Sequence, residues 1–143
     1  PSPPHPRNPP HPSPMRIEIR SVHHRGKHGK EYVSLKANAD CDAGAYILAD
    51  STCRSDGEIT GSLRRTFWLP SKRIARGDYI HVYTSAGANA SFPNRSRTTT
   101  HIVYWGLPDA IWKDDSSCAV LFDIGAWQYC PVQMPSLGAP LLT

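Results

Sequence analysis

Hydrophobic and polar residues alternate along this chain in short segments, with a period of two residues rather than 3.6. In residues 16–22, Ile17 and Ile19 alternate with charged or polar side chains, which is typical of a strand with one buried face. Residues 79–84 are the densest β-favouring run, and their large side chains at successive positions predict a central strand. The whole pattern predicts strands at residues 16–22, 31–36, 45–50, 66–69, 79–84, 101–106, 118–123 and 127–132. We expect the strands at 45–50 and 118–123 to be buried.

The breaks between these segments are rich in glycine, asparagine, aspartate and proline, and no segment has the period of an amphipathic helix. The pattern therefore predicts an all-β sandwich or barrel. The longest polar stretch, residues 85–100, contains one aromatic residue, Phe92, and we expect it to be a long loop. Trp112 precedes a turn and a strand, and we expect its ring to close the core.

The two ends of the chain differ in composition from the middle. Residues 1–14 are proline-rich and have no apolar anchor, so this flexible arm is excluded from a central strand. Three interpretations of the arm stay open: a ligand for a proline-recognising module, an arm that wraps a neighbouring subunit, and a linker. We expect the sandwich at residues 15–132 and a weakly ordered tail at 133–143.

A length of 143 residues fits one domain with tails, and that domain is large enough to bury a core without cross-links. The formal net charge of +4 permits contact with nucleic acid but does not argue for it. No apolar run approaches the roughly 20 residues of a membrane span. These features leave an intracellular and an exported location equally open.

The four cysteines are Cys41, Cys53, Cys118 and Cys130, and none belongs to a CxxC pair of the kind that binds zinc. An even number allows two disulfides in three pairings, or four reduced thiols. Cys41 and Cys53 flank a predicted strand, Cys118 begins one and Cys130 follows one, so all three pairings stay open, including one that joins Cys41 to Cys53.

Four segments carry a family resemblance. They are Glu-Tyr-Val-Ser-Leu-Lys at 31–36, Gly-Ala-Tyr-Ile-Leu-Ala-Asp at 44–50, the run from Phe67 through Leu69-Pro70 to Arg-Gly-Asp-Tyr-Ile at 76–80, and Ile-Trp-Lys-Asp-Asp-Ser-Ser-Cys-Ala-Val-Leu-Phe-Asp at 111–123. In this order they resemble the lamin tail domain. The resemblance covers roughly residues 15–128.

This resemblance implies an immunoglobulin-like antiparallel β-sandwich of about 7–9 short strands. It also implies an interaction module, because members of the family bind protein partners or DNA, and it supplies no catalytic residue. Two positions depart from the family pattern. Ser116-Ser117 replaces the usual Gly-Asp before the last core strand, and Asp114 replaces the turn asparagine.

Our first hypothesis is a non-catalytic module that binds a protein partner or a second copy of itself. Phe67 and Trp68 are neighbours on a predicted strand, so their side chains face opposite sides and one ring is exposed. Exposed aromatic rings often anchor interfaces. The candidate protein-binding residues are Trp68, Phe92 and Trp127.

The first alternative is a nucleic-acid-binding domain whose basic loops contact phosphates. Its candidate residues are Arg25, Lys27, Lys30, Arg64, Arg65, Arg95 and Arg97. His23, His24 and His28 lie in the same loop as three of these cations, which favours an anion over a metal ion there.

The second alternative is an enzyme with an unrecognised site. The sequence contains no G-x-S-x-G, H-E-x-x-H or P-loop motif, so we predict no catalytic residue. The sequence also predicts no cofactor and no metal site.

Overall fold

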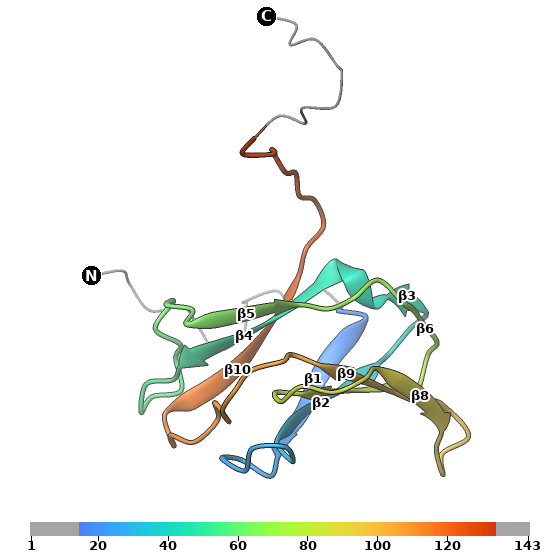
Figure 1. Ribbon diagram of the computed structural model, residues 1–143, viewed down its shortest axis with the longest axis horizontal. Coiled ribbons are helices and arrows are strands. Elements are labelled where there is room, and N and C mark those ends of the chain that lie inside the picture. The colour runs from blue at the N-terminus through green and yellow to red at the C-terminus, as the bar shows by residue number, and fades with distance from the viewer. Residues whose placement is uncertain (1–14, 134–143) are drawn as a thin grey trace, which may run out of the picture.

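The computed structural model describes residues 15–133, so the proline-rich arm and nearly all of the predicted tail lie outside the described residues. The described chain is an all-β, immunoglobulin-like sandwich, and Figure 1 shows its two main sheets facing each other. The strands are β1 (Ile17–His23), β2 (Tyr32–Ala37), β3 (Cys41–Asp42), β4 (Tyr46–Thr52), β5 (Arg65–Trp68), β6 (Arg73–Ile74), β7 (Tyr79–Tyr83), β8 (Ala90–Pro93), β9 (Thr99–Tyr104) and β10 (Ser117–Asp123).

One sheet has five strands in the order β1-β2-β7-β9-β8, and the other has three in the order β10-β4-β5. The predicted central strand is confirmed, because β7 is the third of the five. Its Ile80 and Val82 are buried, whereas Tyr79, His81 and Tyr83 are half-buried on the opposite face. All pairings are antiparallel except that of β7 with β9, which is parallel.

The core lies between the sheets and draws on both of them. Val33 and Leu35 of β2 are buried in one cluster with Tyr46 and Leu48 of β4. Trp112 is only 2% exposed and belongs to the same cluster, which confirms the prediction that it closes the core. Among the described residues, the helical structure is a single short 3-10 turn, η1 (Ala43–Ala45), and no helix is long and apolar enough to cross a membrane.

A buried carboxylate, that of Glu31, joins three parts of the chain. One oxygen accepts hydrogen bonds from the Gly26 and Trp112 amides at 2.7 and 3.1 Å. The other accepts from the Thr84 hydroxyl and the Ile111 amide, both at 2.9 Å. Glu31 therefore ties the β1–β2 loop and the end of β7 to the segment that carries Trp112.

Two expectations for the end of the chain are wrong. Residues 127–132 form no strand, because the chain leaves the sandwich after Ile124 donates its amide to Ala45, and Pro131 has no amide hydrogen to donate (Figure 1). The segment at 118–123 does form a strand, β10, but it is half-exposed rather than buried. The reason is that β10 is an edge strand of the three-stranded sheet.

The expectation of one long loop at residues 85–100 is also wrong, because this stretch contains β8. The strand pairs with β9, and the Asn94 side-chain oxygen closes the hairpin by accepting from the Ser96 and Thr98 amides at 3.0 and 3.2 Å. All four residues of β8 are exposed, since it is an edge strand. It therefore lacks the apolar alternation that identifies a half-buried strand.

Candidate functional site

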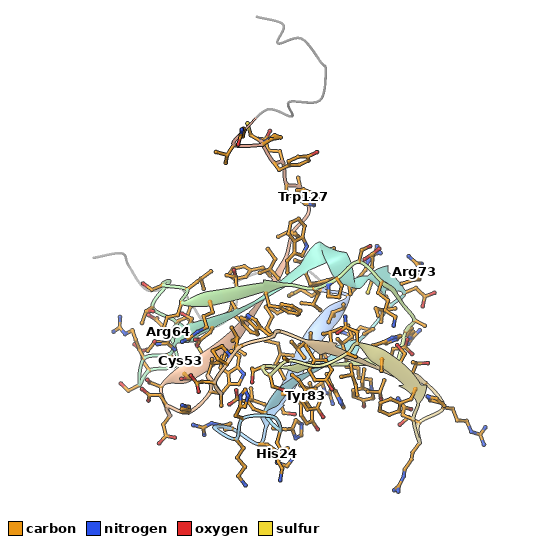
Figure 2. The ribbon with its side chains drawn as sticks, viewed as in Figure 1. His24, Cys53, Arg64, Arg73, Tyr83 and Trp127 are labelled. Atoms are coloured by element: carbon orange, nitrogen blue, oxygen red, sulfur yellow. The ribbon has the colours of Figure 1, made fainter. Side chains whose placement is uncertain are left out.

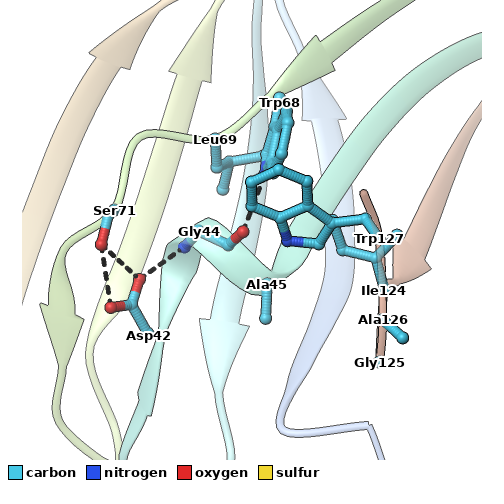
Figure 3. Close-up of a pocket in the computed structure, with 10 residues that line it drawn as sticks. All are labelled: Asp42, Gly44, Ala45, Trp68, Leu69, Ser71, Ile124, Gly125, Ala126 and Trp127. Atoms are coloured by element: carbon cyan, nitrogen blue, oxygen red, sulfur yellow. Dashed lines mark hydrogen bonds between the residues drawn. The ribbon is translucent and has the colours of Figure 1, made fainter. Parts of the chain in front are cut away.

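Two of the three predicted anchor residues meet on one surface. Trp68, the last residue of β5, is 45% exposed, and Trp127, beyond β10, is 59% exposed. Their ring centroids are 4.6 Å apart and the rings are perpendicular (Figure 3). The indole nitrogen of Trp68 donates to the Gly44 carbonyl at 2.7 Å, which fixes the ring. We call these two rings and the pocket beside them the tryptophan surface.

The pocket has a volume of about 800 Å³ and is open to solvent. Its lining residues are Asp42, Gly44, Ala45, Trp68, Leu69, Ser71, Ile124, Gly125, Ala126 and Trp127. Figure 3 shows that side chains from η1, from the segment after β5 and from the segment after β10 converge there.

One wall of this pocket is fixed by Asp42, which caps η1. Its carboxylate accepts from the Gly44 amide at 2.7 Å, from the Ser71 hydroxyl at 3.0 Å and from the Lys72 amide at 3.1 Å. The Gly44 and Ser71 hydrogen bonds hold the pKa of Asp42 below its usual value. Gly44 also packs closely against this wall, because a Cβ there would lie 3.0 Å from the Ser71 Cα and would require Ser71 to shift. The wall is therefore a preformed structure.

The segment that continues from Trp127 is apolar and exposed. Tyr129 is 80% exposed and packs its ring 6.4 Å from that of Trp127, and Val132 is fully exposed. Figure 2 shows this segment extending beyond the three-stranded sheet. It places several large apolar side chains in water at one end of the sandwich.

Phe92, the third predicted anchor, lies elsewhere. It is 45% exposed on β8, at the edge of the five-stranded sheet. Its Cα pairs with that of Thr100 in β9. The structure therefore does not bring Phe92 into the tryptophan surface.

Three of the seven predicted nucleic-acid contacts are engaged within the chain. Arg64 and Arg65 both bind the fully buried carboxylate of Asp50, each with a contact of 2.9 Å. Arg25 donates to the Trp112 carbonyl at 3.0 Å and to the Asp115 carboxylate at 3.1 Å. These arginines neutralise or cap buried groups, and sequence alone does not show that because their partners are distant along the chain.

The other four predicted cations stay exposed, and they lie in two loops at opposite ends of the five-stranded sheet. Lys27 and Lys30 are in the β1–β2 loop, and Arg95 and Arg97 are in the turn between β8 and β9. No hydrogen bond or ion pair is formed by these four side chains among the described residues.

The outer face of the five-stranded sheet carries a row of rings that the sequence analysis missed. His23, Tyr32, Tyr83 and Tyr104 lie on the adjacent strands β1, β2, β7 and β9. Successive centroids are 4.7, 4.9 and 5.3 Å apart, with interplanar angles of 12°, 34° and 27°. We call this row, with Tyr79 and His81 beside it, the aromatic face. The sequence signal for this face was the alternation of Tyr79, His81 and Tyr83 with buried residues, which places the three rings on one face of β7.

The aromatic face and the tryptophan surface lie on opposite sides of the sandwich. Figure 2 shows Tyr83 on the side of the five-stranded sheet away from the three-stranded sheet, whereas Trp127 lies beyond the three-stranded sheet.

Within the aromatic face, His81 is half-buried. Burial, with a smaller effect of the His23 charge, lowers the pKa of His81, which favours a neutral ring.

A serine, a histidine and an aspartate form a hydrogen-bonded chain on the inner side of β8 and β9. The Ser91 hydroxyl lies 2.9 Å from His101 Nδ1, and His101 Nε2 lies 2.8 Å from the buried Asp78 carboxylate. This order of groups resembles a hydrolytic triad. However, Lys72 Nζ also donates to the Ser91 hydroxyl, and Asp78 also accepts from the Thr99 amide at 3.0 Å. These hydrogen bonds thus hold the turn before β7 against β9.

We expect replacement of Asp78 by asparagine to lower the free energy of unfolding near pH 7 by about 1–3 kcal/mol. Burial raises the pKa of Asp78, but hydrogen bonds from His101 and the Thr99 and Ala75 amides outweigh burial and leave it below its ordinary value. A lowered folded-state pKa stabilises the protein above the unfolded-state pKa of about 3.9 and loses that effect as pH falls through the folded-state value.

Urea titrations from pH 7 to pH 2 measure this difference. The gap between the wild-type protein and Asp78→Asn should be fully present above about pH 5 and close as the pH falls through the lowered pKa of Asp78. A gap of constant size over the whole range would show that Asp78 is not the titrating group.

All four cysteines have free thiols, and their surroundings differ. Cys41 and Cys53 are not neighbours, because they lie near opposite ends of β4, whose seven residues span about 20 Å. Cys53 lies instead beside Cys118, the second residue of β10. Burial and this neighbouring thiol raise the pKa of Cys118 to about 12. Burial also raises the pKa of Cys41.

Reaction with a thiol reagent at pH 8 should therefore begin at Cys130, which is exposed. We expect Cys118 to react at least about 100-fold more slowly, since the thiolate is the reactive form and its pKa is raised to about 12. Cys41 should also react more slowly than Cys130, because it is buried and its pKa is raised. Peptide mass spectrometry at successive times gives each rate. Equal rates at Cys118 and Cys130 would contradict this assignment.

Within the part of the chain that the structure describes, no group of three histidine, cysteine, aspartate or glutamate side chains converges as a metal ligand set. His23 and His24 lie against the Tyr32 ring, at centroid distances of 4.7 and 6.2 Å.

A scan against protein-family models, a search of curated proteins and a search of solved structures each find no match to this chain. The lamin tail resemblance therefore stays a prediction from its four segments.

Proposed function

We propose that this chain is a non-catalytic interaction module of the lamin tail type, and that a second copy of the chain binds at the tryptophan surface. The observation that supports this most directly is the exposure of Trp68 and Trp127, which touch each other while 45% and 59% of their surfaces face solvent. Tryptophan rings at the centre of an interface contribute more to binding than most residues. The fixed wall of the pocket favours binding, because a preformed wall loses little conformational entropy when a partner binds.

A second copy is the partner that the surrounding strands support. β5 is an edge strand with a free side, and the apolar segment from Trp127 to Val132 leaves the same end of the molecule. Each copy thus carries both an edge and an exposed apolar segment, which a two-fold interface can join reciprocally.

Two other sheet edges are protected against such pairing. β1 has a register shift between Ile19 and Ser21 and carries the charged pair Glu18 and Arg20. β8 is four residues long and ends in Pro93, which has no amide hydrogen. Bulges, charges and proline are the usual means of blocking edge strands. These features direct the proposed pairing away from the five-stranded sheet.

Sedimentation velocity of the full chain between about 1 and 100 µM tests the proposal, because this range covers the affinities of transient and stable dimers. We expect the weight-average sedimentation coefficient to rise from the monomer to the dimer value. The rise should persist in about 0.5 M salt, since an apolar contact is weakly screened. A monomer at every concentration would overturn the proposal.

Binding to nucleic acid is the second candidate. It is supported by the four exposed cations Lys27, Lys30, Arg95 and Arg97, which lie at the two ends of the aromatic face. Four phosphate contacts predict that the logarithm of the affinity falls with the logarithm of salt with a slope of about −3 to −4. In a gel-shift titration, no shift at micromolar protein would remove this candidate.

A further inference from the structure

The rings of the aromatic face stand on edge. His23, Tyr32, Tyr83 and Tyr104 occupy neighbouring strands, and their centroid spacing of 4.7 to 5.3 Å matches the separation of strands in a sheet. Because neighbouring planes are within 34° of parallel, each ring covers the face of the next. Solvent therefore meets a ridge of ring edges and hydroxyl groups across four strands.

A groove of about 410 Å³ runs beside this ridge. One wall is formed by His23 and Tyr32, and the other by the β8–β9 turn. The floor lies on β2, β7 and β9. Its lining residues are His23, Tyr32, Ser34, Tyr79, His81, Asn94, Arg95, Ser96 and Thr100, and none of these described residues is acidic.

The shape and chemistry of this groove favour a polyproline II peptide over a nucleobase. A base stacks on an exposed ring face, and the faces within this row are covered by one another. Proline rings instead fit into aromatic-lined grooves, and the carbonyls of a polyproline II helix have no internal hydrogen-bond partners. The groove lining includes Tyr32, Tyr79 and Asn94, whose hydroxyl and amide groups are donors for such carbonyls.

The chain itself contains a segment of this composition. Residues 1–14 read Pro-Ser-Pro-Pro-His-Pro-Arg-Asn-Pro-Pro-His-Pro-Ser-Pro, and they immediately precede Met15. The strand that follows begins with Ile17 paired to Ala37, at the same end of the sheet as Tyr79 and the β8–β9 turn. Fourteen residues in polyproline II conformation extend about 40 Å, and the distance from β1 to β9 is about 15 Å.

We propose that the groove beside the aromatic face is a polyproline II binding site, and that residues 1–14 of the same chain are its ligand. This site is on the opposite side of the molecule from the tryptophan surface, so it does not depend on the proposed self-association. A short connection gives the arm an effective concentration in the millimolar range, which favours binding within one molecule.

Nuclear magnetic resonance of the isotope-labelled full chain tests the site. We expect nuclear Overhauser effects between proline Hδ atoms of residues 1–14 and the rings of Tyr32 and His81. These should disappear in Pro9→Ala/Pro10→Ala, which alters the ligand, and in Arg95→Ala, which alters the far wall of the groove. The matched control is Tyr129→Ser, which removes an exposed tyrosine outside the face and should leave them unchanged.

A labelled synthetic peptide of residues 1–14 provides the second readout. It should bind Pro9→Ala/Pro10→Ala about tenfold more tightly than the wild-type chain, whose own arm competes. Equal binding, or identical ring shifts in the wild-type and arm-substituted chains, would overturn the proposal. Ring shifts caused by oligothymidylate but not by the peptide would also overturn it, in favour of nucleic acid.

Discussion

Replacement of Glu31 by alanine is expected to lower the free energy of unfolding by about 3–5 kcal/mol, a large part of the total stability of a domain of this size. The substitution removes the carboxylate that accepts four hydrogen bonds. It leaves the Gly26, Ile111 and Trp112 amides without this hydrogen-bond acceptor. The side chain is fully buried, so water does not replace the lost acceptor without opening the core. Chemical denaturation of the purified variant measures the change.

Two controls separate this effect from a general loss of charge. Glu31→Gln keeps the shape of the side chain and one acceptor oxygen, and it should retain more stability than Glu31→Ala. Asp109→Ala removes an exposed carboxylate and should change stability by less than about 0.5 kcal/mol. A loss below about 1 kcal/mol for Glu31→Ala would show that the three joined segments do not depend on this carboxylate.

Replacement of Trp127 by alanine is expected to weaken self-association by about 30-fold to 1,000-fold, because a central tryptophan contributes about 2–4 kcal/mol to an interface. The fold should be unchanged, since Trp127 lies beyond the last strand and 59% of its surface is exposed. Sedimentation velocity gives the dissociation constant, and circular dichroism verifies the fold. Trp68→Ala should have a comparable effect, because its ring forms the other half of the contact.

Phe92→Ala is the matched control for this prediction. Phe92 and Trp68 are both 45% exposed, but Phe92 lies at the edge of the other sheet. Its replacement should leave the dissociation constant within about twofold of the wild-type value. If Phe92→Ala weakens association as much as Trp127→Ala does, the interface is not centred on the tryptophan surface.

The strands could be predicted because their signal is local. The alternation in β1 and the double-faced run in β7 are set by residues two positions apart, and both strands form where expected. β8 escaped prediction because an exposed edge strand has no apolar alternation. The path of the chain after Ile124 could not be predicted either. An apolar segment forms a strand only where the edge of another strand is available for pairing, and the local sequence does not show this.

The candidate site was only partly predictable, for a related reason. The exposure of Trp68 follows from its place next to Phe67, but its contact with Trp127 depends on the route of the chain after β10. The engagement of Arg64 and Arg65 by Asp50 depends on the register of β5 with β4, which places Arg65 opposite Asp50, and on the loop that carries Arg64. The row of rings depends on strand register, which places Tyr32 beside Tyr83 and Tyr83 beside Tyr104.

Photo-crosslinking from position 127 tests the proposed interface most directly. A photoreactive phenylalanine analogue replaces Trp127 in an equal mixture of isotope-labelled and unlabelled chains, and mass spectrometry then separates crosslinks within one copy from those between copies. We expect mixed-label crosslinks that join position 127 of one copy to residues 65–71 of the other. Crosslinks confined to single copies at concentrations where the chain is dimeric would contradict the tryptophan surface as the site of self-association.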